Sequence, residues 1–421
     1  MQAWTCWATC RSRRCGRPFA RPSRSSGRVL RRTIWIPRRM GSRPPWPRPE
    51  ESEKLPVYAD PTEGVTVQAP LLRAWTVALL EKIGTPGDIA ADVAEILVSA
   101  DRRGIASHGT ARLPSYVALV EAGVMDPAAR PRVDRERAAL ARIDANNGWG
   151  HHASRFAIDW AIERARSTGS ATAIVHNSNH YGIAGWYALR AAEAGMIGFS
   201  VTNASPLVAP TRALRALLGT NPIAIAAPAG HFGAFCLDMA TSTVPVGRIE
   251  VAKRRGESLP VGWAIGADGR PATTPDEAQA GALLPLGGLE ETAGYKGYGL
   301  SLAVDILSGV LGDATFGPNI IGLFRPEAPS DLGHAFWVID PAAFEEPGAF
   351  EQRLERLLDQ LVAADTVPDA PGRVLIPGEP EAEAERRSDA RGITIDAQHH
   401  ASLVELAEAN GVAFPDISPN G

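Results

Sequence analysis

The chain has 421 residues, of which 45% are hydrophobic and 21% are charged, and its formal net charge is −4. This length exceeds that of a single-core domain, so we expect two or three lobes with the composition of an ordinary globular protein. The slight negative charge argues against a general nucleic-acid binder, and no apolar run approaches the roughly 20 residues that span a bilayer.

The first 49 residues differ from the rest, because they contain thirteen Arg, three of the four Cys and no Asp or Glu. Such a segment repels itself and cannot bury a core. Three interpretations stay open: an Arg-rich transit peptide, a nucleic-acid-binding arm, or a start site assigned too early, with Met40 as a later start. We predict that residues 1–55 form a disordered extension, artefactual under the third interpretation.

Beyond that extension only Cys236 remains. A single cysteine makes neither a disulfide framework nor a thiolate zinc site, and this usage is typical of a reducing cytosol. We therefore expect a cytoplasmic protein that does not bind a membrane.

From residue 68 the apolar spacing is helical. The first helix ends at Gly84 and places a set of large apolar residues on one face: Leu71, Leu72, Trp75, Leu79 and Leu80. The next helix is predicted to begin with Thr85 as its cap. A third helical pattern covers 107–123, where Pro114 must lie in a first turn or at a kink.

The middle of the chain changes character. Four short apolar runs bounded by Gly, Pro or Asn predict buried strands at 171–177, 196–203, 222–228 and 234–240. Helices are predicted at 153–168, ended by Gly169, and at 184–194. Residues 247–295 indicate Gly- and Pro-rich loops. A helix over 296–312, a strand over 334–340 and helices near 347–363 and 398–410 complete the pattern, with a Pro/Glu/Arg-rich linker between the last two.

A dinucleotide-binding fingerprint of the G-x-G-x-x-G type is missing from the sequence. Three glycine-bearing loops do lead into predicted helices: "NNGWGHHAS", "NHYGIAG" with Gly182, and "GYKGYGLS" with Lys296. Glycines let backbone approach a ligand, and a helix N-terminus favours anions. Each loop alone is also explained by a tight turn that enters a helix.

The stretch "SHGTARLPSY" contains Ser107, His108, Arg112 and Tyr116. If it is helical, the last three share a face, since each follows the previous one by four residues. An Arg fork beside a histidine and hydroxyls suits a small molecule that carries a carboxylate. A solvated helix face with incidental polar residues is the alternative.

His180, in "SNHYGIAGWYA", follows a predicted strand and precedes a predicted helix. An alcohol dehydrogenase must remove the hydroxyl proton as hydride leaves carbon, and histidine titrates near neutrality. The alternative is a histidine that is merely hydrogen-bonded at a strand end. Asp238 in "LDMATS", and Thr220 and Asn221 in "LLGTNP", are likewise balanced between ligand contacts and structural turns.

Spacings typical of other catalytic sites are missing. No H-E-x-x-H motif indicates a metal site, so we predict none, and no G-x-S-x-G elbow indicates a serine hydrolase.

Taken together, the blocks "SADRRGIASHGTARLPSYV", "SNHYGIAGWYA", "GTNPIAIAAP", "FCLDMATS", "LPVGWAIGADGRPATTP" and "GYKGYGLSLAVDILSGVLG" resemble the malate/L-lactate dehydrogenase family, in the same order. The resemblance runs from about residue 68 to 415. It implies an α+β, non-Rossmann fold, in which a largely antiparallel or mixed central sheet binds NAD(P) beside a helical domain built from both chain ends. It also implies a homodimer.

The implied division is a helical N-terminal part of the substrate and dimer domain (56–145), an NAD(P)-binding sheet domain with loops (146–340), and a C-terminal helical segment that packs on the N-terminal part (341–421).

The resemblance also implies roles for single residues. His180 would be the catalytic acid–base, Arg112 would bind the carboxylate and His108 would orient the substrate oxygen. Further pocket contacts would come from Ser107, Tyr116, Thr220 and Asn221. The cofactor would be contacted by Asp238, Met239, Ala240, Lys296, Gly182 and Arg248.

Two departures put substrate and cofactor preference in question rather than reaction class. Gly247–Arg248 stands where the family commonly has Gly-Lys, and Arg212 and Arg215 precede the "GTNP" block, where they would reshape the pocket or favour the phosphate of NADP. The expected function is NAD- or NADP-dependent interconversion of a small 2-hydroxy acid and its 2-keto acid. The alternatives are cyclic imine 2-carboxylate reduction, ureidoglycolate or sulfolactate oxidation, and a catalytically silent nucleotide-binding scaffold.

Overall fold

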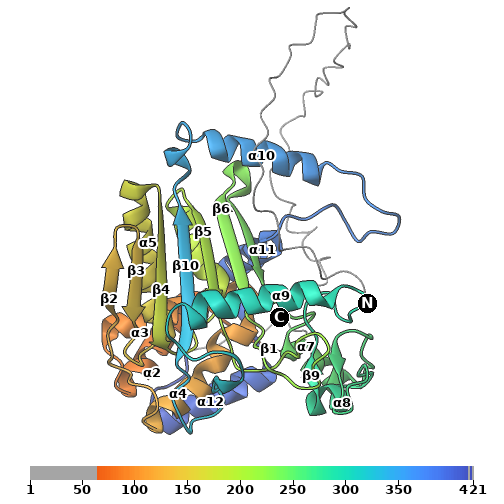
Figure 1. The fold of residues 1–421 in the computed structure, drawn as a ribbon. Coiled ribbons are helices and arrows are strands. Elements are labelled where there is room, and N and C mark those ends of the chain that lie inside the picture. Colours follow the sequence, from red (N-terminus) through yellow and green to blue (C-terminus); the bar gives the residue numbers. More distant parts are fainter. Residues whose placement is uncertain (1–63, 416–417, 420–421) are drawn as a thin grey trace, which may run out of the picture. The chain divides into compact units, whose positions relative to one another are not determined.

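The computed structural model describes residues 64–415 and 418–419, so the predicted extension over 1–55 lies outside the described residues. A mixed sheet of seven strands organises the described part (Figure 1). In spatial order its strands are β2 (Arg132–Arg137), β3 (Leu140–Asp144), β4 (Ser170–Ser178), β10 (Leu332–Ile339), β5 (Ile197–Thr202), β6 (Ile223–Pro228) and β7 (Ala234–Met239).

Five of the six neighbouring strand pairs in this sheet are antiparallel, and only β3 and β4 run parallel. A doubly wound nucleotide-binding fold needs a mostly parallel sheet. The arrangement therefore confirms the predicted non-Rossmann, largely antiparallel sheet, and it explains why the glycine fingerprint is missing.

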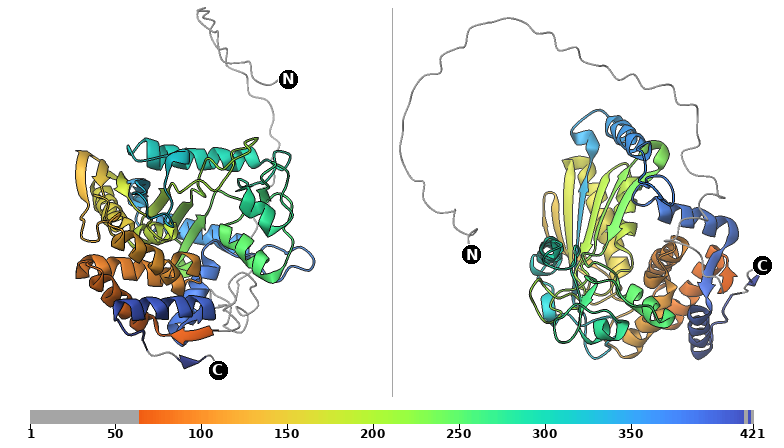
Figure 2. Two further views of the ribbon diagram at one scale, coloured as in Figure 1. Left: turned by 90° about the horizontal axis from the view of Figure 1, so that it is seen from below. Right: turned by 90° about the vertical axis from the view of Figure 1, so that its right-hand side faces the viewer.

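Helices cover the two faces of the sheet differently. On one face α5 (Gly150–Thr168) and α6 (Ala184–Glu193) pack against β4, β10 and β6 through a core rich in alanine, which lets helix and sheet approach closely. On the other face lies α9 (Gly294–Asp305), which continues into a π-helical turn at Ile306–Val310. Figure 2 shows α9 and α5 on opposite sides of the strands.

Alternation along β10 supports the same division. Phe336 and Val338 are buried in the core beneath α5 and α6. Gly333, on the opposite face, lies so close to the π-helical turn that a Cβ there would be 2.0 Å from the Ser308 carbonyl oxygen. Trp337 points to this second face, stacks on Phe199 at 4.8 Å between ring centroids, and stays 44% exposed.

Both ends of the chain build the helical layer beside the sheet. Its elements are α2 (Ala69–Lys82), α3 (Gly87–Arg102), α4 (Leu113–Glu121), α12 (Ala397–Asn410), β1 (Gly64–Val67), β11 (Ile393–Asp396) and β12 (Ser418–Pro419). β1 pairs with β11 and β12, and apolar residues of both chain ends share one core around Leu97 and Leu403. This confirms the helical domain expected from both chain ends. The boundaries predicted at 145 and 340 stay a prediction.

Several local expectations were wrong. Leu71 is 46% exposed, because it lies on the outer side of α2. Thr85 does not cap α3, because the cap position of that helix is Pro86. The Thr85 hydroxyl instead accepts a hydrogen bond from the Trp149 indole. Residues 106–112 form two 3₁₀ turns, Ala106–His108 and Thr110–Arg112, and α4 begins only at Leu113.

Regions expected to be irregular contain further elements. The predicted loops over 247–295 include α7 (Val246–Arg255), α8 (Pro275–Ala280) and the short pair β8 (Ala264–Ile265) and β9 (Ala282–Leu283), around a small core of their own. α10 (Ala349–Val362) confirms the predicted helix near 347–363. The linker that follows it holds α11 (Glu379–Arg391) and β11.

No helix in residues 64–415 combines the length and apolarity that crossing a membrane requires. The cytoplasmic location stays a prediction.

Candidate active site

His180 lies in the loop between β4 and α6, close to the first turn of α5. Its Nδ1 is 2.6 Å from the Tyr116 hydroxyl and 3.3 Å from the Gly182 amide nitrogen, which donates to it. Its Nε2 has no hydrogen-bond partner among the described residues. One ring nitrogen is therefore held by the protein, and the other is left for a ligand.

Burial is the main cause that lowers the pKa of His180 well below its usual value, and the neighbouring His108, His151, Arg112 and His334 add to the effect. The imidazole is therefore neutral near pH 7, as a general base must be before it accepts a proton.

The segment 106–112 brings three predicted site residues to this loop. The His108 ring stacks on His180 with 5.7 Å between centroids, and its Nδ1 is 2.9 Å from the Ser107 hydroxyl. Burial and Arg112 lower the pKa of His108 to about 4. Arg112 donates from Nε to the Ser107 carbonyl, and its guanidinium lies 5.0 Å from the centre of the exposed Phe324 ring. These residues converge through 3₁₀ turns rather than through one helix face.

Asp101 holds the segment 106–112 in place through hydrogen bonds to Thr110. Its Oδ2 accepts from the Thr110 amide at 2.9 Å and from the Thr110 hydroxyl at 2.7 Å. That hydroxyl also lies 3.2 Å from Nε2 of His399, which α12 contributes. Oδ1 of Asp101 is buried without a partner among the described residues. α12 thereby helps to place the turn Thr110–Arg112, which directly follows the turn of His108 and carries Arg112.

A second buried layer fixes the loop of His180 from the sheet side. Tyr181 stacks on His334 of β10, with 4.5 Å between centroids. His334 in turn contacts the hydroxyls of Thr202 at 2.7 Å and Ser178 at 2.9 Å. These residues were missed by sequence reasoning, although His334 begins the predicted strand "HAFWVID" and a histidine inside a buried strand indicates a polar partner.

Two glycines shape the entry into α6. Gly182 has φ of 80°, a left-handed conformation that other residues adopt at a cost. Gly185 lies against Asp238: a Cβ there would be 2.7 Å from the carboxylate, and the Gly185 amide donates to Asp238 Oδ2 at 2.7 Å. Burial raises the pKa of Asp238 to about 6. The start of α6 is thus joined to the end of β7.

The other residues predicted to contact the cofactor lie on several elements. Met239 ends β7 and Ala240 follows it, both partly buried. Lys296 in the first turn of α9 and Arg248 in α7 are exposed, and neither forms an ion pair among the described residues. Arg212 differs, because it pairs with Glu290.

Thr220 and Asn221 connect these elements. The Thr220 carbonyl accepts from the Thr241 amide at 2.8 Å. Asn221 is fully buried, accepts from the Ala204 amide at 3.1 Å and donates to the Ser301 carbonyl of α9 at 3.0 Å. Backbone groups engage both ends of its amide, so its position is structural. Contact with a ligand stays a prediction for both residues.

The hydrogen-bonding and charged groups near Asp238 and in α7 and α9 determine whether a nicotinamide dinucleotide fits. The Gly185 amide is occupied by Asp238, so the start of α6 does not offer this donor to a phosphate. The other oxygen of Asp238, which has no partner among the described residues, suits a ribose hydroxyl. Lys296 and Arg248 supply unpaired positive charge for phosphates. These residues fit the group.

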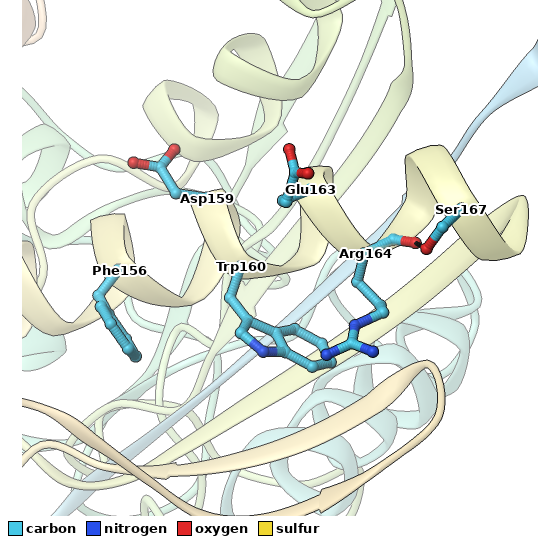
Figure 3. Close-up of a pocket in the computed structure, with 6 residues that line it drawn as sticks. All are labelled: Phe156, Asp159, Trp160, Glu163, Arg164 and Ser167. Carbon is cyan, nitrogen blue, oxygen red and sulfur yellow. Dashed lines mark hydrogen bonds between the residues drawn. The ribbon is translucent and has the colours of Figure 1, made fainter.

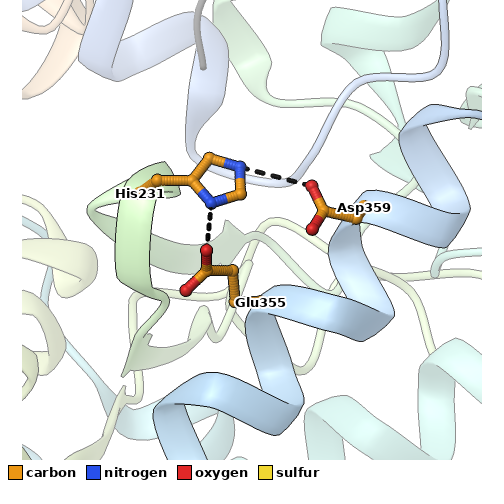
Figure 4. A group of neighbouring side chains, drawn as sticks. All are labelled: His231, Glu355 and Asp359. Carbon is orange, nitrogen blue, oxygen red and sulfur yellow. Dashed lines mark hydrogen bonds and ion pairs between the residues drawn. The ribbon is translucent and has the colours of Figure 1, made fainter. Parts of the chain in front are cut away.

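Two other features lie away from His180. A groove of about 380 Å³ runs along the outward face of α5 and is lined by Phe156, Asp159, Trp160, Glu163, Arg164 and Ser167 (Figure 3). It contains none of the predicted site residues. At the other end of the β6–β7 hairpin, His231 is flanked by Glu355 and Asp359 of α10 (Figure 4).

That second group is the one place in the described residues where three potential metal ligands lie within reach of one ion. The two ring nitrogens of His231 face different carboxylates, as in an ion-paired histidine, and Nε2 is 3.3 Å from Asp359 Oδ1. The prediction that the protein has no metal site stays a prediction.

Comparisons with known proteins agree with the geometry. Residues 67–404 match the family model described as malate/L-lactate dehydrogenase. Malate dehydrogenase of Pyrococcus abyssi is 44% identical over 310 residues, which are 73% of this chain and 84% of that protein. L-sulfolactate dehydrogenase of Methanothermobacter thermautotrophicus is 36% identical over 329 residues, 78% of this chain and 92% of that protein.

The structure of malate dehydrogenase from Pyrococcus horikoshii OT3 superposes with a TM-score of 0.78 at 39% identity, and the match covers 85% of this chain and 98% of that one. Other relatives are named as a ureidoglycolate dehydrogenase that uses NAD(+), a (2R)-3-sulfolactate dehydrogenase that uses NADP(+) and a pyrroline-2-carboxylate reductase. The chain belongs to the malate/L-lactate dehydrogenase family of oxidoreductases.

Proposed function

We propose that the protein interconverts a small 2-hydroxy acid, such as malate or L-lactate, and its 2-keto acid with NAD or NADP. The observation that carries the proposal is the state of His180. Its Nδ1 is held by Tyr116 and Gly182, its Nε2 has no partner among the described residues, and His108 and Arg112 lie at the same loop.

Each residue has one task in this reaction. The Arg112 guanidinium binds the substrate carboxylate, since its planar fork matches two carboxylate oxygens. His108 orients the substrate oxygen, and Ser107 holds His108 by its hydroxyl contact of 2.9 Å. His180 Nε2 takes the hydroxyl proton during oxidation and returns it during reduction. The nicotinamide, when bound, accepts or supplies the hydride.

The identity of the acid is open between related chemistries. Relatives are named for malate, for sulfolactate, for ureidoglycolate and for a cyclic imine carboxylate. All of these substrates carry a carboxylate next to the reacting carbon, which is the group that Arg112 would hold. Reduction of a cyclic imine 2-carboxylate is therefore the second candidate, since it needs the same hydride and proton.

The cofactor would lie along Asp238, Met239 and Ala240, with Gly182 near the nicotinamide end. Lys296 and Arg248 would face its phosphates. Binding of NADH and of NADPH, measured separately by fluorescence titration, decides the preference. An Arg248→Ala change that weakens NADPH alone would assign Arg248 to the additional phosphate.

We also propose that the protein is a homodimer joined through α9. Together with the π-helical turn that continues it, this helix buries small or polar residues such as Ser301, Asp305 and Ser308. From Leu300 to Leu311, helix and turn expose six large aliphatic residues: Leu300, Leu302, Ile306, Leu307, Val310 and Leu311. An apolar surface of this kind is unusual on a monomer and fits a second copy of the chain.

Leu307→Asp tests this interface by light scattering after size exclusion. We expect the variant to be monomeric, whereas Leu140→Asp, at an exposed apolar residue on β3, stays dimeric. A dimer that persists in both variants would remove α9 from the interface.

The function itself is tested by assaying oxidation of NADH and NADPH against a panel of 2-keto acids and cyclic imine carboxylates. Turnover of keto acids supports the proposal, and turnover of imines alone favours the second candidate. Cofactor binding without turnover of any substrate would favour a catalytically silent scaffold. Failure to bind either cofactor would contradict all of these enzymatic interpretations.

A further inference from the structure

His151, the second residue of α5, lies behind the residues described so far. It is fully buried, and its Nε2 is 3.4 Å from the Tyr116 hydroxyl. Its Nδ1 has no hydrogen-bond partner among the described residues. Among the described residues, the Tyr116 hydroxyl is thus the sole hydrogen-bond partner of the His151 imidazole.

Tyr116 stands between two histidines, because its oxygen also lies 2.6 Å from His180 Nδ1. Its ring packs edge-on against His151, with 5.2 Å between centroids. The three side chains form a chain from the protein interior to the loop of His180. The pKa of Tyr116 is raised by burial, so its hydroxyl keeps its single proton near neutral pH.

A single proton cannot be donated to both neighbours. In one arrangement Tyr116 donates to His180 Nδ1, the His180 proton is on Nε2, and the Tyr116 oxygen accepts from His151 Nε2. In the other arrangement Tyr116 donates to His151 Nε2, and its oxygen accepts from a proton on His180 Nδ1. Only the second arrangement leaves His180 Nε2 as a free base.

The Gly182 amide favours the first arrangement, because it donates toward His180 Nδ1 at 3.3 Å. An acceptor on the far side of Tyr116 is needed to oppose it. His151 is such an acceptor, since burial lowers its pKa to about 3 and keeps the ring neutral.

We propose that His151 is a positioning residue that sets, through the hydroxyl of Tyr116, which ring nitrogen of His180 carries the proton. The inference rests on the proposed function, in which His180 is the acid–base. During oxidation His180 Nε2 would form a bond to the substrate's hydroxyl proton as the O–H bond breaks, and the O–H electron pair would form the new C=O bond. The C–H electron pair would leave with the hydride, which a bound nicotinamide would accept. In the resulting imidazolium the Nδ1 proton stays bonded to Nδ1 and is donated to the Tyr116 oxygen, so no further proton moves.

Imidazole nitrogen NMR on the full chain without ligands reads the tautomers directly. We expect His151→Leu to lower the fraction of His180 that carries its proton on Nδ1. His151→Gln, whose amide oxygen can accept from Tyr116, should restore most of it. His152→Leu is the matched control, because this neighbour bonds to Asp92 instead of Tyr116.

Kinetics give the second readout. Loss of a residue that orients another typically costs about 10- to 100-fold, so His151→Leu should lower kcat for oxidation by about that factor with little change in KM. In a Tyr116→Phe background the same change should have no additional effect. An effect that persists in that background would show that His151 acts through packing, and an unchanged His180 tautomer in His151→Leu would overturn the proposal.

The two proposals fail separately. If His180→Ala retains full turnover, the acid–base assignment is wrong, while the tautomer measurement still reports whether His151 and His180 are coupled. If His180→Ala is inactive and His151→Leu changes neither tautomer nor kcat, only the role of His151 is lost.

Discussion

Two groups of histidines lie in contrasting environments in this molecule. Around Tyr116, the rings of His108, His151 and His180 are packed together without a carboxylate partner among residues 64–415, and burial lowers the pKa of each. His231 lies 34% exposed between Glu355 and Asp359. The first group has hydroxyls as partners, which donate or accept as required, whereas carboxylates only accept. The difference supports the proposed proton transfer at the first group, whereas the second group attaches α10 to the β6–β7 hairpin.

Replacement of a histidine in each group should separate these roles most clearly. We expect His180→Ala to lower kcat/KM by about 10³-fold, because general acid–base catalysis typically contributes that much. His231→Ala, the same change in the exposed group, should leave steady-state rates unaltered. Equal losses in the two variants would abolish the distinction, and unchanged turnover in His180→Ala would remove His180 from its role.

Replacement of Arg112 tests whether the group of histidines around Tyr116 lies at a site that binds a substrate carboxylate. Arg112→Met should lower kcat/KM for a keto acid by about 100-fold, mostly through KM, since hydrogen bonds to charged groups contribute about 1.5–3 kcal/mol. Arg130→Met, which removes an exposed ion pair with Asp88, is the control. A pure kcat effect without a change in KM would assign Arg112 to another task.

Asp101, beneath His108, extends the comparison to stability. Burial raises its pKa to about 7 in the folded protein, above the value of about 4 expected in the unfolded chain. The folded state therefore binds the proton more tightly. The stability that this group contributes is complete below about pH 4 and is lost as pH rises to about 7.

Asp101→Asn should remove this pH dependence. From pH 4 to pH 8, the free energy of unfolding of the variant should therefore rise relative to that of the wild type by on the order of a few kcal/mol. Urea unfolding at both pH values measures it. The same stability difference between variant and wild type at both values would contradict the assignment.

The smallest effect is expected on the stability of the protein when His231 in the exposed group is replaced. His231→Ala should lower the free energy of unfolding by at most about 1 kcal/mol, because exposed ion pairs contribute little, and added salt should reduce the difference. A larger, salt-independent loss would indicate that His231 does more than hold α10.

The sequence was most informative where one periodicity decided the outcome. The alternating, alanine-rich strands β4 to β7 and the helix α5 were predicted because each buries one uniform face. The strands β2 and β3 were both missed: Arg132–Arg137 is almost entirely polar and exposed, and Leu140–Asp144 is only five residues long. The turns at 106–112 were included in the helix predicted over 107–123, because the helical pattern of that stretch was taken to begin at residue 107. Tertiary contacts with Asp101 and His399 hold those turns, and no local pattern encodes such contacts.

For the site, the family resemblance assigned His180, Tyr116 and His108 to one pocket, and the structure places both Tyr116 and His108 against His180. His334 and His151 were not identified, because a buried histidine looks like any other core position until its partners are known. For Asn221 the sequence left a ligand contact and a structural turn open; the structure shows both ends of its amide bound to backbone, and a ligand contact stays a prediction.

The pairing of β1 with β11 has a consequence for how the chain is made. Gly64 lies opposite Asp396 in that ladder, so the first described strand finds its partner only after more than 300 further residues have been synthesised. The central sheet, whose strands all precede residue 340, is complete before then. Folding on the ribosome would therefore finish with the helical layer. Because His399 contacts Thr110, the turn that carries Arg112 gains this support only after residue 399 has been synthesised.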